Sequence, residues 1–306
     1  MTNTELFLKE ASKSWNVKTS VKMSEYTTFK IGGDADVAVF PKTADELRGA
    51  VTLAKDMGLP YYVVGRGSNL LVADEGYRGA IIFTSDMAET VLDGNTVRAE
   101  CGVGLTSLSR AVGKGGLSGM ECLCGIPGSV GGAVYMNAGA YGGEMKDITI
   151  SSDYYSPTLG FGTLVGEEQD FSYRHSAYCE SDKIIISCTM KLSFGDPREI
   201  HAKEEEHLRA RREKQPLEYP SAGSTFKRYP GRFTGKMIED AGLKGFRVGG
   251  AFVSEKHAGF LVSDGTATAL DMVTLISKVR ERVYEKEGVL IECEVKYLSP
   301  EGEEKI

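Results

Sequence analysis

The stretch GIPGSVGGAVYMNAGAYGG, residues 125–143, decides how the rest of the chain is interpreted. Seven of its nineteen residues are glycine and none is charged. Side chains this small cannot form an ordinary core, and a solvated disordered segment would carry charge. Glycine lets the backbone approach a ligand closely, and exposed N–H groups in such loops bind anions. We therefore expect a loop that cradles a diphosphate and passes under a flat ring, with Gly125, Ile126, Pro127, Gly128, Ser129, Gly132, Asn137, Gly139 and Ala140 as candidate contacts.

A second glycine turn follows the short apolar strand at Tyr61–Val64. It is not the G-x-G-x-x-G fingerprint, because Leu70 stands where the third glycine would fall, and no G-K-[ST] Walker sequence follows. Taken alone, this turn is more readily interpreted as a tight structural turn than as a ligand-binding loop. Two separated phosphate-cradling loops suggest a long dinucleotide, and the contacts expected from this turn are Gly65, Arg66, Gly67, Ser68, Asn69 and Leu70.

Composition excludes several classes of protein. The chain has 306 residues, a net charge of −7 and 41% hydrophobic residues, which is ordinary for a globular protein and argues against a nucleic-acid binder. There is no apolar run of transmembrane length and no signal-peptide core near the start, so we expect a cytoplasmic protein. The six cysteines have no framework spacing, and Cys122-Leu-Cys124 is too tight for a usual zinc site, so no metal is expected.

Periodicity predicts an α+β chain in three parts. Residues 1–80 indicate an α/β unit, with a helix at 4–13, another opened by a capping box at Thr43–Glu46, and short strands. Residues 81–200 indicate a mixed α+β part with many strands and one helix at 106–116.

Residues 201–306 predict a third part. It begins with a charged helix at 200–214, whose charge run indicates a solvated face. A later helix at 267–286 has an apolar stripe. A final strand is predicted at 289–298. Its alternation places Ile291, Cys293 and Val295 on one face and both glutamates, Glu292 and Glu294, on the other, where spacing alone favours solvent.

A few polar side chains are candidates for chemistry. Arg174 follows Tyr173 among aromatic residues that would desolvate its guanidinium, although a lone arginine is usually a surface residue. Ser224 follows a glycine and has no histidine in a triad relation, so it is a better proton donor than nucleophile. Lys227 offers a point charge for a phosphate or a carboxylate.

Taken together, the motifs resemble a known family. The order YTTFKIGG, VVGRGSNLLV, GIPGSVGGAVYMNAGAYG, FSYRHS, GSTFK, MIEDAGLKG, VSEKHAGF and LIECEVKYL is similar to that of the UDP-N-acetylenolpyruvoylglucosamine reductases, from about residue 18 to residue 298. The resemblance implies a two-part FAD-binding module of PCMH type followed by a C-terminal α/β substrate-binding domain. It also implies a cytoplasmic, NADPH-dependent enzyme of peptidoglycan precursor synthesis that reduces an enolpyruvyl ether with non-covalent FAD.

The resemblance also assigns roles. Arg174, Ser224 and Glu294 match the family's catalytic arginine, proton donor and catalytic glutamate, and Tyr173 and Lys227 match substrate-contacting positions. The glycine turn and the glycine-rich stretch match its flavin-binding segments.

The chain departs from the family pattern at two positions, and two rival functions remain. Lys30 stands where arginine is frequent, Gly259 stands where asparagine is frequent, and no tyrosine-bearing insertion follows Arg174, which indicates the shorter type II subtype. A flavin oxidase acting on an alcohol or sugar is one rival. A non-catalytic nucleotide-binding protein is the other.

Overall fold

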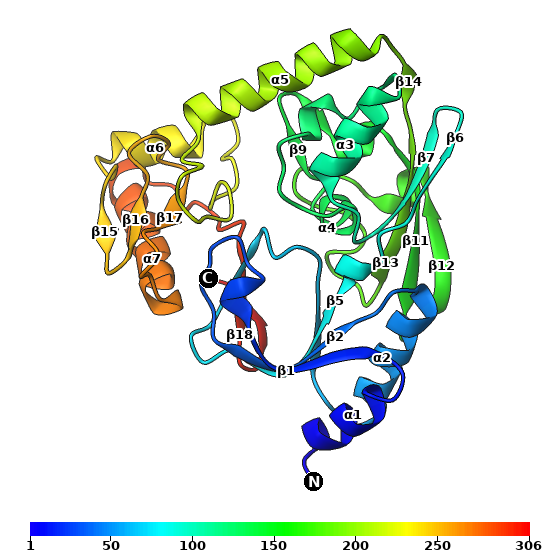
Figure 1. Cartoon of the computed structure of the whole chain (residues 1–306). Helices are drawn as coiled ribbons and strands as arrows, with labels where there is room; N and C mark the ends of the chain where they lie inside the picture. Colours follow the sequence, from blue (N-terminus) through cyan, green and yellow to red (C-terminus); the bar gives the residue numbers. More distant parts are fainter. The chain divides into compact units, whose positions relative to one another are not determined.

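The computed structural model describes residues 1–306, which form two compact units (Figure 1). Each unit is built from three separate segments. Unit 1 comprises Met1–Val17, Ala38–Arg66 and Ile81–Ala210, and unit 2 comprises Lys18–Val37, Gly67–Ala80 and Arg211–Ile306. The division into parts 1–80, 81–200 and 201–306 stays a prediction.

Seven α-helices occur, and those expected from periodicity are among them. The helices are α1 (Asn3–Ala11), α2 (Ala44–Asp56), α3 (Leu105–Lys114), α4 (Val130–Tyr135), α5 (Pro197–Lys214), α6 (Thr234–Asp240) and α7 (Ala269–Glu287). Thr43 caps α2 by accepting the Glu46 N–H at 3.2 Å, as the sequence predicts. The Glu46 carboxylate accepts from the Lys42 N–H rather than from the cap residue, so the capping box is not reciprocal.

Unit 1 is organised around an antiparallel five-stranded sheet in the order β12-β11-β13-β7-β6 (Figure 1). Alternate residues of its central strands enter the core, among them Val97, Ala99, Cys188 and Met190. The strands of this sheet and the smaller strands of the unit are β6 (Thr90–Asp93), β7 (Thr96–Glu100), β11 (Thr149–Ser156), β12 (Gly160–Val165), β13 (Ile184–Lys191), β3 (Tyr61–Val64), β8 (Leu117–Ser118), β9 (Gly139–Ala140), β10 (Gly143–Glu144) and β14 (Ser193–Phe194).

Three strands contain points at which the chain passes from one unit to the other. They are β1 (Asn16–Lys22), β2 (Asp34–Phe40) and β5 (Tyr77–Phe83). Their apolar residues are largely buried, including Val37, Val39 and Ile81.

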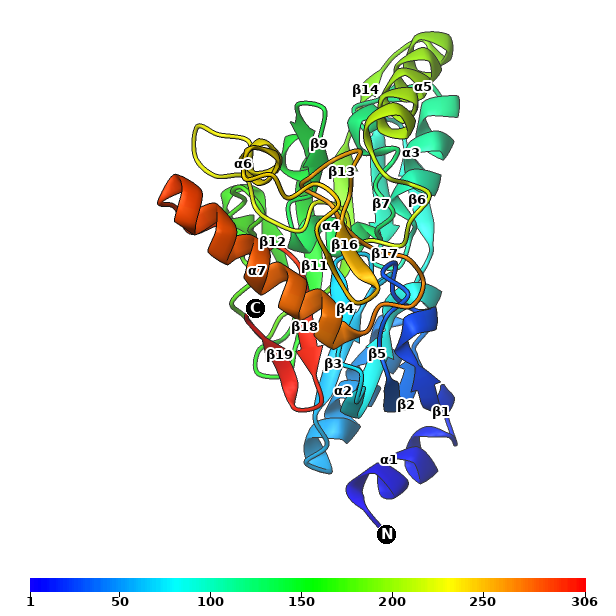
Figure 2. The ribbon, with the colours of Figure 1, turned by 90° about the vertical axis from the view of Figure 1, so that its left-hand side faces the viewer.

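Unit 2 has its own core beneath α7. The predicted stripe of Met272, Ile276, Val279 and Val283 is buried, and it packs in one cluster with residues from the small sheet β15-β16-β17. The hairpin of β18 and β19, seen in red in Figure 2, continues through β18 into a parallel pairing with β4. The strands of this unit are β4 (Leu70–Val72), β15 (Arg247–Val248), β16 (Ala251–Val253), β17 (Leu261–Ser263), β18 (Lys296–Ser299) and β19 (Gly302–Glu304).

Two expectations about local structure were wrong. The final strand starts at Lys296 rather than at residue 289, and the segment before it holds only an isolated bridge between Phe226 and Cys293. The region 81–200 holds two α-helices instead of one, because α4 lies inside the glycine-rich stretch. The α+β class predicted from the sequence is the one observed.

Candidate active site

The start of the first glycine turn packs against the glycine-rich stretch within unit 1. A Cβ added to Gly65 would lie 2.4 Å from Oγ of Ser129, so only glycine allows this approach. A Cβ added to Gly104 would lie 2.8 Å from Nη2 of Arg66, which places the guanidinium beside the residue that precedes α3. Two of the segments predicted to bind one ligand are therefore neighbours.

An antiparallel bridge between Gly104 and Ser129 organises this region. Val130 N–H donates to the Val103 carbonyl at 2.9 Å and Leu105 N–H donates to the Gly128 carbonyl at 3.0 Å. In such a pair the N–H groups of the two bridged residues point away from each other. The amides of Gly104 and Ser129 therefore point in opposite directions, and the bridge fixes the backbone of both segments beside the Arg66 guanidinium.

Asn137 supports the glycine-rich stretch through its side chain. It is fully buried, and Nδ2 donates to Oε2 of Glu144 at 3.0 Å and to the Ser172 carbonyl at 2.9 Å. Its Oδ1 accepts the Lys146 N–H at 2.9 Å. The side chain is engaged by the protein, so any contact between Asn137 and a ligand would involve its backbone.

Arg174 lies in a tight turn with a strained backbone. Ser172 and His175 exchange two backbone hydrogen bonds of 3.2 Å, which makes Tyr173 and Arg174 the central residues. Arg174 has φ +55°, at the position where turns of type II favour glycine. Its Nη2 donates to the Gly139 carbonyl at 3.3 Å, and its guanidinium lies 5.0 Å from the Tyr173 ring centre. The predicted catalytic arginine and the predicted flavin loop therefore meet.

Glu144 is a charged neighbour of Arg174 that sequence reasoning missed. Burial acts to raise the pKa of this carboxyl, but hydrogen bonds from Lys146 and Asn137, with the positive charges of Lys146 and Arg174, leave the pKa below its usual value. Lys146 Nζ lies 2.8 Å from Oε2 of Glu144. Nothing in the local sequence pattern marks this residue, because Asn137 and Arg174 come from other turns and only Lys146 is a near neighbour in sequence.

The remainder of the first glycine turn belongs to unit 2. Thr28 N–H donates to the Gly67 carbonyl at 3.2 Å. Gly67 has φ +58°, and an added Cβ would lie 2.1 Å from the Tyr26 carbonyl oxygen, so a side chain is excluded here for a reason internal to the protein. The exposed Lys30 follows with φ +58°, and the side chain of its neighbour Phe29 is buried in the core.

Ser224, Lys227 and Glu294 lie on two adjacent segments of unit 2. Lys227 N–H donates to the Glu292 carbonyl at 2.9 Å, and Glu294 N–H donates to the Thr225 carbonyl at 2.8 Å. Ser224 is exposed, whereas Thr225 is fully buried and receives the Leu261 N–H on its hydroxyl at 3.2 Å. The structure thus brings Ser224 next to the segment that carries Glu294.

The two glutamates of this segment have different surroundings. Glu292 is exposed and its Oε2 lies 3.2 Å from Nζ of Lys227, while Glu294 is half-buried. The alternation expected for a regular strand is lost, because Ile291 and Val295 are buried but Cys293 is only partly so. A role for Glu292 as the ion partner of Lys227 was not predicted.

Gly259 packs closely against the side chain of His257. The Gly259 N–H donates to Nδ1 of His257 at 3.1 Å, and an added Cβ would lie 2.9 Å from Cε1 of the same ring. Burial lowers the pKa of His257, which keeps this nitrogen an acceptor. A side chain at position 259 would therefore require the His257 ring to shift.

Comparison with known proteins decides the family. A model of the UDP-N-acetylenolpyruvoylglucosamine reductase C-terminal domain matches residues 215–298, and an FAD binding domain model matches residues 35–158. The reductase of Caldicellulosiruptor bescii is 49% identical over 278 residues, covering 90% of this chain and 88% of the relative. The chain belongs to the UDP-N-acetylenolpyruvoylglucosamine reductase family.

Other members of the reductase family agree with this assignment. The reductase of Latilactobacillus sakei is 44% identical over 294 residues, covering 96% of this chain and 97% of the relative. The crystal structure of the reductase (MurB) from Thermus caldophilus is 36% identical, with a TM-score of 0.80, and covers 92% of this chain and 99% of that chain. The chain is therefore an FAD-binding oxidoreductase of peptidoglycan precursor synthesis, with the FAD-binding and C-terminal domains predicted from the sequence.

The residues of unit 1 fit FAD. The exposed Arg66 guanidinium beside Gly104 offers a positive charge for a diphosphate, and a Cβ added to Gly132 would meet only Oγ of Ser129, at 3.6 Å. Gly104, the neighbour of Arg66, was not singled out by the sequence, although a glycine directly before an amphipathic helix is a signal that could have found it. None of the helices is both long and apolar enough to cross a membrane.

Proposed function

We propose that this reductase converts the enolpyruvyl ether of UDP-N-acetylglucosamine to UDP-N-acetylmuramate with electrons from NADPH. The observation that carries the proposal is Arg174, whose turn holds its backbone in a left-handed conformation and whose side chain donates to the Gly139 carbonyl. Non-glycine residues keep such strain mainly at functional sites. The glycine-rich stretch, which matches the family's flavin-binding segment, thus directly contacts the arginine that matches its catalytic position.

The roles of the side chains follow from the charge that develops on the substrate. When bound, FAD supplies a hydride from N5 after taking it from NADPH. Addition of the hydride to the terminal carbon of the double bond sends the electron pair towards the carboxylate. Arg174 stabilises that negative charge as a preorganised cation, and Glu294 is the second catalytic group of the proposal. Tyr173 and Lys227 bind the substrate.

Ser224 completes the reaction by protonating the α-carbon. A serine hydroxyl is a weak acid in water, but the carbanionic enolate is a strong base. The proton and the hydride together saturate the double bond, NADPH becomes NADP⁺, and water restores the serine proton. The position of Ser224, exposed yet next to the fixed backbone of Thr225, suits a donor to a ligand.

Both glycine loops contribute FAD contacts in this proposal, and the flavin is not covalently attached. Denaturation and filtration should therefore release the yellow colour, whereas colour retained on the chain would favour the rival flavin oxidase. The proposal includes the cytoplasmic location expected from the sequence, and nucleic acid has no part in it.

The test separates the two half-reactions. NADPH should bleach the wild-type flavin absorbance at about 450 nm without oxygen, and the enolpyruvyl substrate should restore it. Ser224→Ala should leave bleaching intact but slow the recovery by about 10²–10⁴-fold, the usual size of a general-acid contribution. Ser277→Ala, an exposed serine on α7, is the matched control and should change neither step.

Two outcomes would contradict the assignment. Equal loss of both half-reactions in Ser224→Ala would rule out a proton donor. Wild-type protein that never recovers its absorbance with substrate would favour the non-catalytic nucleotide-binding alternative.

A further inference from the structure

Asn69, at the end of the first glycine turn, uses its side chain to hold a distant segment of unit 2. Its Nδ2 donates to the main-chain carbonyl of Glu294 at 3.0 Å. Its own carbonyl accepts the Lys296 N–H at 3.0 Å. The turn and the segment that carries Glu294 are thus joined by two hydrogen bonds on one residue.

The parallel pair β4 and β18 explains why this connection matters. Leu70 pairs with Lys296, so the turn and Glu294 both lie just before the first paired residues. Residues 291–295 are outside β18 and lack a regular ladder of their own. The side-chain bond from Asn69 therefore extends the pairing past the end of the strands.

Glu294 is held at both of its main-chain polar groups. Its N–H donates to the Thr225 carbonyl at 2.8 Å, and its carbonyl accepts from Asn69. The first bond connects Glu294 to the segment of Ser224, and the second connects it to the glycine turn. The backbone position of Glu294 depends on both bonds, because no continuous strand fixes it.

We propose that Asn69 is a positioning residue, whose side-chain amide sets where Glu294 stands relative to the glycine turn. The inference rests on the proposed function, in which Glu294 acts on substrate and the turn contributes to the flavin site. In this proposal the Asn69 side chain binds the Glu294 carbonyl, whereas the sequence suggested that it would contact the cofactor. A misplacement of about 1 Å in such a constellation can cost about 10²-fold in rate.

Asn69→Asp is the primary test, because it keeps the shape and removes the donor. Its carboxylate would face the Glu294 carbonyl, so the bond is replaced by repulsion. Measured per mole of bound flavin, reoxidation by substrate should be slower by about 10–10²-fold, and bleaching by NADPH should slow much less. Asn69→Gln, which keeps an amide donor, should be faster than Asn69→Asp.

Asn95→Asp is the matched control. Asn95 also donates from Nδ2 to a main-chain carbonyl, that of Leu192 at 2.5 Å, but it lies in unit 1 on no predicted site segment. Neither half-reaction should change in this variant. A similar slowing there would show that losing any such bond is sufficient, and would overturn the proposal.

A double-mutant cycle separates positioning from general stability. If Asn69 acts through Glu294, Asn69→Asp should add less than about two-fold to the loss already caused by Glu294→Gln. Losses that multiply, or bleaching by NADPH that slows as much as reoxidation by substrate when both are measured per bound flavin, would each overturn the proposal. Failure of the proposed function would look different, because wild-type reduced enzyme would then not be reoxidised by substrate.

Discussion

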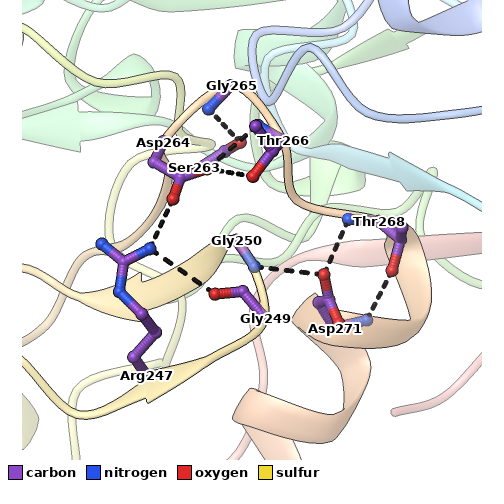
Figure 3. Close-up of polar contacts among 9 residues, drawn as sticks. All are labelled: Arg247, Gly249, Gly250, Ser263, Asp264, Gly265, Thr266, Thr268 and Asp271. Carbon is purple, nitrogen blue, oxygen red and sulfur yellow. Dashed lines mark hydrogen bonds and ion pairs between the residues drawn. The ribbon is translucent and has the colours of Figure 1, made fainter.

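The glycine-rich stretch of unit 1 and the turns around Gly249 and Gly250 in unit 2 look similar in sequence but differ in what surrounds them. Figure 3 shows the turns of unit 2, where the Asp271 carboxylate accepts the Gly250 N–H at 3.2 Å and the Thr268 N–H at 3.1 Å. A Cβ added to Gly249 would lie 2.3 Å from that carboxylate. These glycines lie against the N-terminal cap of α7, and the N–H and the carbonyl of Gly250 are both hydrogen-bonded within the protein.

The stretch of unit 1 contains both kinds of glycine side by side. A Cβ added to Gly131 would lie 2.7 Å from Cβ of Cys101, whereas one added to Gly132 would have only Oγ of Ser129 nearby, at 3.6 Å. A count of glycines therefore does not identify a ligand loop. The space around each Cα separates glycines that the packing of the protein requires from glycines that leave room beside them.

The largest expected effect lies in unit 2. Gly249→Ala adds a methyl group at φ +52° and displaces the Asp271 carboxylate from its two backbone donors. Loss of the cap together with backbone strain should lower the free energy of unfolding by about 2–4 kcal/mol, measured by urea denaturation. Gly265→Ala is the control, because its φ of +96° has the strain but nothing within 4 Å, and it should cost about half as much. Equal losses would show that the contact with Asp271 is unimportant.

A neighbouring pair in unit 1 tests the two kinds of glycine directly. Gly131→Ala must move the Cys101 backbone and should cost about 1–3 kcal/mol of stability. Gly132→Ala lies in a helix with room for the methyl group, so its stability should be unchanged or slightly higher. Flavin absorbance per mole of protein should nevertheless fall in Gly132→Ala. Full occupancy with a normal spectrum would mean that this glycine does not contact the cofactor.

The smallest effect is a pH dependence in unit 2. The Thr266 hydroxyl and N–H, with Arg247, lower the pKa of Asp264 from 3.8 to about 2. A depressed folded pKa contributes stability above pH 3.8, and that contribution is lost as the pH falls through about 2. The difference in melting temperature between wild type and Asp264→Asn should therefore shrink across this range. A difference that stays constant from pH 6 to pH 2 would exclude Asp264 as its source.

Local patterns predicted the parts of the fold that depend on neighbours in sequence. The cap at Thr43 and the buried stripe of α7 follow from hydrogen bonding within one turn and from the 3.6-residue period. The strand at 289–298 failed for a physical reason. The sequence of residues 291–295 alternates between apolar and polar residues, but a ladder forms only where a partner strand lies, and β4 pairs with the chain from Lys296 onward.

The candidate site also has features that the sequence predicted and features that it could not predict. The sequence named Arg174, Ser224 and Glu294 through the order of the motifs, but it could not show that Arg174 meets the Gly139 carbonyl. It suggested a ligand contact for Asn137, whose side chain is occupied by Glu144, Ser172 and Lys146. Polar side chains bond to whichever group the fold brings near, and a glycine-rich context carries no information about that.

The sequence by itself determined the helix caps, the apolar stripes, the α+β class and the family, because each depends on residue types at short spacing or on motifs in a set order. Only the tertiary structure decided which glycines are crowded and which carbonyl each polar side chain reaches. Asn69 and Glu294 are 225 residues apart along the chain, and their hydrogen bond exists because β4 and β18 pair in one register. Such a contact is a property of the whole packed unit, and no local pattern encodes it.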